Sequence, residues 1–183
     1  MRTVLLAALA LAAFPGAAVA QAPGRDSVVG SGVVDTGASL VSFALDATSG
    51  PAGEDPGGTG SIASAGGVVT CLRVSGNTAL IGVDNEVIPH FPVDAIFSVV
   101  DGGPAGAGDT LAVQFLSAPP TPATCSFPAG ITPTPMPVQS GDIAIHDAPP
   151  LPASKQDCKN GGWRQLGFRN QGRCVRATKP SQP

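Results

Sequence analysis

The sequence predicts an all-β protein, an antiparallel β-sandwich of jelly-roll type followed by a short disulfide-closed tail with at most one short helix. Short β-rich runs alternate apolar and polar residues, which is the period of a half-buried strand. Segments rich in Gly, Pro and Asp separate these runs at short intervals, and the 3.6-residue period of an amphipathic helix is missing. Aromatic residues make up 4% of the chain and Tyr is absent, so the core must be built mainly from aliphatic residues.

The clearest element is a β-hairpin over residues 68–83, around which the other strands are expected to assemble. Gly76 and Asn77 form a two-residue turn of the type that tolerates positive φ. This turn places Thr70 opposite Val83 and puts Cys71 on the wetter face of the hairpin. The face predicted to enter the core consists of Leu72, Val74, Ala79, Ile81, Val83 and the methyl group of Thr70.

Further strands are expected on both sides of this hairpin, separated by turns and glycine-rich loops. The expected strands are 28–34, 40–46, 61–63, 93–100, 110–116 and 141–146, and the expected loops are 35–37, 47–60, 85–92 and 101–109. Residues 117–139 carry seven prolines, so we expect at most one short edge strand there, near residues 124–127.

The N-terminal residues have the pattern of a secretory signal peptide, which predicts a secreted, extracellular protein. Arg2 precedes an apolar run over 5–14, and the small residues 18–20 form a cleavage site. That run is half the length of about 20 residues that a membrane helix needs, and no transmembrane segment is expected later in the chain. The predicted organisation is a signal peptide over 1–20, a β-sandwich domain over 21–147, a proline-rich linker over 148–153 and a basic tail over 154–183.

Four cysteines in an exported chain predict two disulfide bonds, for which three connectivities exist. Proximity in the chain favours Cys158 with Cys174, and this choice leaves Cys71 with Cys125. In the tail, residues 154–157 have the form of a capping box and Gly161 suits a helix C-terminus, so one or two helical turns across Cys158 are expected.

The charges are divided between an acidic body and a basic tail. Residues 21–153 hold two basic and twelve acidic residues, a net charge of −10, whereas residues 154–183 hold seven basic residues and Asp157, a net charge of +6. Such a tail is either a solvated appendage or a patch that attracts an anionic cell-wall or surface component. Contact with the acidic body would also satisfy its charges. Trp163 is its only tryptophan, so nucleic acid is not the expected partner.

Residues 30–147 resemble the post-COAP-type domain of exported bacterial proteins, and the tail resembles a short C-terminal element attached to exported actinobacterial proteins. The resemblance implies a secreted β-domain and supplies no catalytic residues, cofactor or established activity. The segments that carry it are 41–47, 70–81, 101–110 and 141–146 in the domain, and 154–163 and 170–175 in the tail.

Residues 33–39 also resemble the Asp-Thr-Gly-Ala signature of retroviral-type aspartic proteases, and residues 80–84 resemble their later apolar-Gly-x-Asp segment. In that family two aspartates share a proton and activate a water molecule. The resemblance therefore implies a homodimer in which Asp35 pairs with its twin. The alternative interpretation is a turn between two strands, in which the Asp35 side chain caps local backbone N–H groups.

Other chemistry has little support in the sequence. His90 and His146 are far apart and lack partners at metal-ligand spacing. Glu54, Asp55, Asp101 and Asp109 lie in loops that could bind calcium, which makes a calcium-stabilised adhesion module a further alternative. We therefore expect a secreted, non-catalytic β-domain that binds a cell-surface or extracellular-matrix component. No cofactor is expected, and no catalytic or metal-binding residue is assigned.

Overall fold

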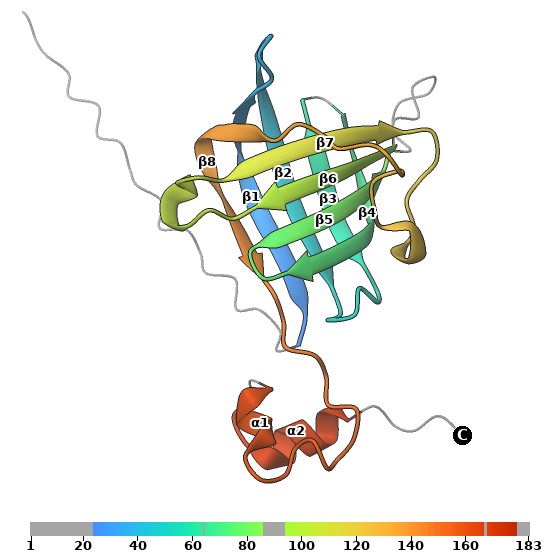
Figure 1. Ribbon diagram of the computed structural model, residues 1–183, viewed down its shortest axis with the longest axis vertical. Helices are drawn as coiled ribbons and strands as arrows, with labels where there is room; N and C mark the ends of the chain where they lie inside the picture. The colour runs from blue at the N-terminus through green and yellow to red at the C-terminus, as the bar shows by residue number, and fades with distance from the viewer. Residues whose placement is uncertain (1–23, 64, 86–93, 167, 179–183) are drawn as a thin grey trace, which may run out of the picture.

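The computed structural model describes residues 24–63, 65–85, 94–166 and 168–178, and within them eight antiparallel strands close into a barrel (Figure 1). Each strand pairs with its neighbours in sequence, and β1 pairs with β8 to complete the circle. The strands are β1 (Asp26–Asp35), β2 (Leu40–Ser49), β3 (Gly57–Ile62), β4 (Ala65–Ser75), β5 (Thr78–Asp84), β6 (Asp94–Val100), β7 (Thr110–Leu116) and β8 (Met136–His146).

The predicted all-β, antiparallel character is confirmed, but the arrangement is one closed sheet and not two sheets packed face to face. Closure requires β1 and β8 to pair, which they do over eight residue pairs from Ser27–His146 to Val34–Val138. A closed barrel leaves no free outer strand, so β3 is an interior member of the sheet and not the short edge strand expected from residues 61–63. Gly57 to Gly60, expected in a loop, belong to this strand.

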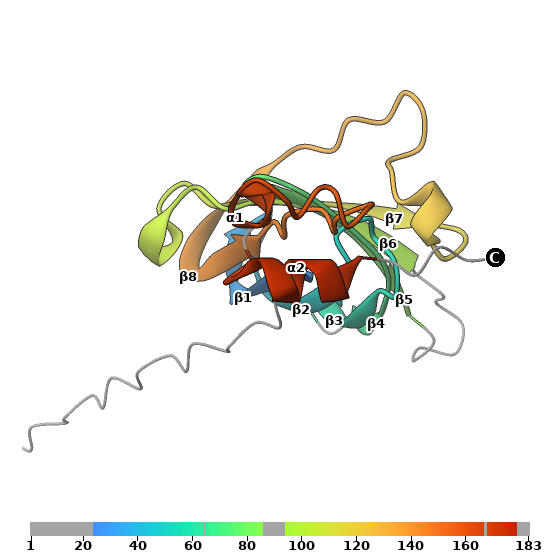
Figure 2. The same ribbon diagram turned by 90° about the horizontal axis from the view of Figure 1, so that it is seen from below.

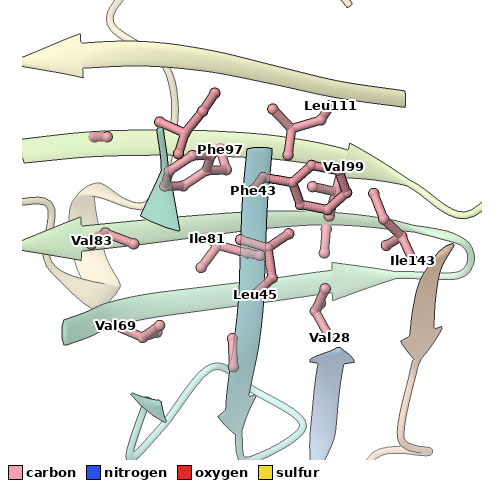
Figure 3. Close-up of a cluster of buried hydrophobic side chains, with 14 of the residues drawn as sticks. Val28, Phe43, Leu45, Val69, Ile81, Val83, Phe97, Val99, Leu111 and Ile143 are labelled. Carbon is pink, nitrogen blue, oxygen red and sulfur yellow. The ribbon is translucent and has the colours of Figure 1, made fainter. Parts of the chain in front are cut away.

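Apolar side chains from all eight strands fill the barrel interior (Figure 3). Alternate residues point inward, as in Phe43, Leu45 and Ala47 of β2. Among the described residues, Phe97 is one of the largest buried side chains, with 2% of its surface exposed. Close approach of β1 and β8 requires glycine at position 32, because a Cβ there would clash with the carbonyl oxygen of Ser140 and crowd the Phe43 ring.

The central hairpin forms as predicted, with one correction to its register. Residues 71–75 pair with residues 78–82 as the Gly76–Asn77 turn requires. A β-bulge at Thr70 then makes Val69, and not Thr70, the partner of Val83. The bulge carries Val69 into the core at 3% exposure.

The first part of the proline-rich segment between β7 and β8, up to Cys125, is held against the outside of the barrel. It contains a short 3₁₀ helix, η2 (Pro122–Thr124), in place of the edge strand expected near residues 124–127. Cys125 bonds to Cys71 on β4, and Pro120 covers the outer side of Gly82. Arg73 adds a hydrogen bond to the Pro122 carbonyl at 3.2 Å. The segment is therefore held at its middle by a covalent bond and a side-chain contact.

The tail lies beyond the end of the barrel at which β8 finishes (Figure 1), and Figure 2 shows its second helix crossing below that end. Its described residues contain two short helices, α1 (Gly162–Gln165) and α2 (Gln171–Ala177), where at most one was expected. Residues 154–161, which include Cys158, form turns and not the expected helix. Gly161, expected at the C-terminus of a helix, has a φ of 87° and instead precedes α1.

Candidate functional site: the basic tail

The loop over residues 101–109 completes the barrel where strand pairing is incomplete. β7 and β8 pair only at Thr110 and Leu111. Beyond these pairs, Asp109 Oδ2 accepts a hydrogen bond from Ile143 N at 2.7 Å, and Asp101 Oδ2 accepts one from Ile145 N at 3.2 Å. The two carboxylates thus replace the missing strand partner along this side of β8.

The remaining carboxylate oxygens of these two aspartates hold the loop itself. Asp109 Oδ1 accepts from Gly102 N at 2.9 Å, and Asp101 Oδ1 accepts from Gly103 N at 3.0 Å. Asp109 is buried, with 1% of its surface exposed. All four carboxylate oxygens of Asp101 and Asp109 therefore accept hydrogen bonds from backbone N–H groups. These are the oxygens that the sequence offered as calcium ligands. Among the described residues, no cluster of three or more His, Cys, Asp or Glu side chains has a metal-binding arrangement.

The other predicted acidic and histidine positions are dispersed. Glu54 accepts from Ala52 N at 2.8 Å within its own turn, and the Asp55 carbonyl accepts from Arg25 at 2.9 Å. His146 ends β8, while His90 lies outside the described residues. The structure does not bring these side chains into one site.

Asp35 lies on the exposed turn between β1 and β2. Its Oδ1 accepts a hydrogen bond from Gly37 N at 2.8 Å, the geometry of an Asx turn. The second segment of the protease resemblance lies in β5, where Ile81 is fully buried in the core and Gly82 is covered by Pro120. In this chain the first segment therefore forms a turn between two strands, and the second segment packs in the barrel wall and core.

Two aspartates fix the chain where it leaves β8 toward the tail. Asp26 Oδ1 accepts from Ala148 N at 2.8 Å, and Asp147 Oδ2 accepts from Gly76 N at 2.6 Å. Burial raises the pKa of Asp26 above its ordinary value. The nearby Asp147 and Glu54 charges also raise this pKa, whereas the hydrogen bond from Ala148 N lowers it. The first residues of the linker are consequently anchored to the barrel.

The remainder of the linker also packs on the barrel. Pro152 is fully buried, and residues 150–153 share a shallow pocket of about 250 Å³ with Pro51, Ala52 and Glu54. This pocket places the proline-rich linker beside the loop between β2 and β3. The tail therefore begins from a defined place at one end of the barrel.

The tail is a compact unit closed around its disulfide bond. Cys158 and Cys174 are bonded, and both are completely buried in a segment of mostly exposed residues. Asn170 caps α2 by accepting from Arg173 N at 2.9 Å. Both disulfides have the connectivity that proximity in the chain favoured. They indicate an extracellular or otherwise oxidising environment.

The tail exposes its positive charges. Among the residues that the structure describes, none of the tail's basic side chains forms an ion pair with a carboxylate. The Cζ atom of Arg164 lies over the Trp163 ring, 4.9 Å from the ring centre, in a cation–π contact. Asp157, the tail's one acidic residue, accepts a hydrogen bond from Ser154 N at 2.8 Å. The exposed basic residues are Lys155, Lys159, Arg164, Arg169, Arg173 and Arg176.

The resulting class is a disulfide-crosslinked antiparallel β-barrel with a compact cationic appendage. No protein-family model, no curated protein and no solved structure matches the chain. The resemblance to the post-COAP-type domain stays a prediction. No helix among the described residues is both long enough and apolar enough to cross a membrane.

Proposed function

We propose that this chain is a secreted, non-catalytic binding protein whose tail attaches it to an anionic polymer of a cell wall or extracellular matrix. The observation that carries the proposal is the set of six exposed basic side chains on one disulfide-closed unit, without carboxylate partners among the described residues. These cations keep their attraction for an external polyanion, because no ion pair with a carboxylate of the described residues has to be broken before binding.

The tail's construction supports binding rather than simple solvation. A flexible cationic segment would lose conformational entropy when it binds, whereas the Cys158–Cys174 bond and the two short helices order the chain in advance. The Arg164 guanidinium, already stacked on Trp163, offers paired N–H donors to a phosphate or carboxylate. The barrel then serves as a stable carrier that displays the tail.

Cosedimentation of the mature protein with isolated cell walls tests the proposal. The binding variant replaces all six exposed basic residues of the tail with Gln, and the control replaces Arg25 and Arg73 of the barrel with Gln. We expect salt-sensitive retention of the wild type and the control, with at least a tenfold loss of affinity in the tail variant. Retention that is equal in all three proteins, or absent at low salt, would overturn the proposal.

Defined polymers identify the chemistry that is recognised. Binding to a soluble polyphosphate or polyuronate, but not to a neutral polysaccharide of similar length, is the expected result. A single-stranded oligonucleotide of equal charge serves as a comparison. Tighter binding to the oligonucleotide than to either polymer would assign the tail to nucleic acid and contradict the proposed partner.

A further inference from the structure

A short Thr-Pro segment on the barrel's outside has the features of a modification site. Residues 131–135, with the sequence Ile-Thr-Pro-Thr-Pro, connect the turn at Pro128 to the start of β8 and have no regular secondary structure. Thr132 and Thr134 are both exposed, and Ile131 before them is 41% exposed. Figure 2 shows the chain between η2 and β8 bowing away from the barrel wall, on a different side from α2.

Proline holds this segment extended. A proline fixes its own φ, and it also disfavours the helical conformation of the residue before it, which here is Thr132 and then Thr134. An enzyme that binds its substrate as an extended chain would find this segment already in that form and would pay little to order it.

The two hydroxyl groups are also chemically available. Neither Thr132 nor Thr134 makes a side-chain hydrogen bond with another described residue. By contrast, the nearby Thr121 and Thr124 hydroxyls lie 3.0 Å apart and together form a capping box at the N-terminus of η2. Those two hydroxyls are committed to local structure, although they lie in the same proline-rich segment.

We propose that Thr132 and Thr134 are sites of O-linked glycosylation, carried out by a glycosyltransferase during or after export. Exposed threonines alternating with prolines in an exported chain are the composition of O-glycosylated segments. This proposal is independent of the binding function of the tail, since it concerns another face of the barrel and needs no anionic partner.

The reaction requires an activated sugar phosphate, either lipid-linked or nucleotide-linked, as the glycosyl donor. The threonine Oγ attacks the anomeric carbon, and a new carbon–oxygen bond forms as the bond from that carbon to the phosphate oxygen breaks. The phosphate leaves as an anion, and the hydroxyl proton passes to a base of the transferase. No oxidation or reduction takes place, so the only products are the glycosylated chain and the released phosphate compound.

Mass spectrometry of the intact protein, purified from the culture fluid of the organism that encodes it, tests the assignment. We expect a mass above that of the processed polypeptide by one or more sugar residues. Fragmentation that preserves side-chain linkages should place them on Thr132, Thr134 or both. The double variant Thr132→Ala, Thr134→Ala should lose the added mass, whereas Thr59→Ala, at an exposed position on β3, should keep it.

Each contrary result overturns the assignment. An unmodified peptide spanning residues 131–136, sugar confined to other residues, or a phosphate in place of a sugar would all do so. Site mapping on the wild-type protein does not depend on the variants, so the test holds even if a variant is not exported.

Discussion

Replacing Asp109 tests whether carboxylates complete the barrel between β7 and β8. Its two oxygens accept from Ile143 N at 2.7 Å and Gly102 N at 2.9 Å, and the side chain is 1% exposed. Asn would keep one acceptor and direct an NH₂ group at the other donor. Ala would leave both backbone N–H groups without a partner.

The expected losses follow from the number of buried donors left unsatisfied. One such donor costs about 1–3 kcal/mol, so Asp109→Asn should lower the free energy of unfolding by about that amount and Asp109→Ala by about 2–6 kcal/mol. In a chain of this length, the Asn variant should melt roughly 2–12 °C below the wild type.

Urea unfolding followed by circular dichroism measures these losses, with Asp142→Asn as the matched control. Asp142 is exposed and directly precedes Ile143 on β8, so this control should stay within about 0.5 kcal/mol of the wild type. Equal stability of Asp109→Asn and Asp142→Asn would refute the structural role of the carboxylate.

A calcium titration of the same proteins separates the structural role from a metal-binding role. If Asp109 only accepts backbone N–H groups, neither calcium nor a chelator should move the wild-type midpoint. A calcium-dependent rise that disappears in Asp109→Asn would instead make this residue a calcium ligand and contradict a purely structural role for its carboxylate.

Three further predictions concern the barrel core, the chain exit and the tail. Phe97→Ala should cost about 3–5 kcal/mol in urea unfolding because the ring is 2% exposed, and Phe115→Ala, at 49% exposure, should cost clearly less; equal losses would contradict the assigned core. Burial raises the folded-state pKa of Asp26 above 3.8, so its contribution to stability is greatest at low pH and is lost as pH rises through the folded-state pKa. Asp26→Asn keeps an acceptor without the charge and should be more stable than the wild type at pH 7 but not near pH 3; a less stable variant at pH 7 would oppose this. Removing the Cys158–Cys174 bond by Ser substitution should cost the tail about 3 kcal/mol and open it to trypsin while the barrel resists, and an equally resistant tail would show that the bond is dispensable.

Local patterns in the sequence were sufficient for most strands and for the central hairpin. β7 spans the predicted residues 110–116, and β4 and β5 meet at the predicted Gly76–Asn77 turn. These features depend on alternation and turn chemistry, which act over a few residues. The bulge at Thr70 has no such local signal, because a bulge serves the curvature of the whole sheet. The core position of Val69 was therefore missed.

The aspartates of the 101–109 loop show the same difference between what a local sequence pattern indicates and what the whole fold decides. Their spacing suggested oxygen ligands for calcium, since carboxylates in a glycine-rich loop are suited to a cation. Only the tertiary structure shows that Ile143 and Ile145, more than 30 residues later in the chain, present backbone N–H groups to them. The carboxylates have partners that no local pattern could identify.

By itself, the sequence determined the all-β character, the favoured cysteine pairs and the separation of an acidic body from a basic tail. These properties follow from composition, period and chain proximity. The tertiary structure decided that β1 meets β8 to form a barrel, that Asp26 and Asp147 anchor the exit of the tail, and that the tail's cations face solvent without carboxylate partners among the described residues. The physical reason is that closure and charge pairing depend on which distant segments share a surface, and only the complete packing of the strands sets those distances.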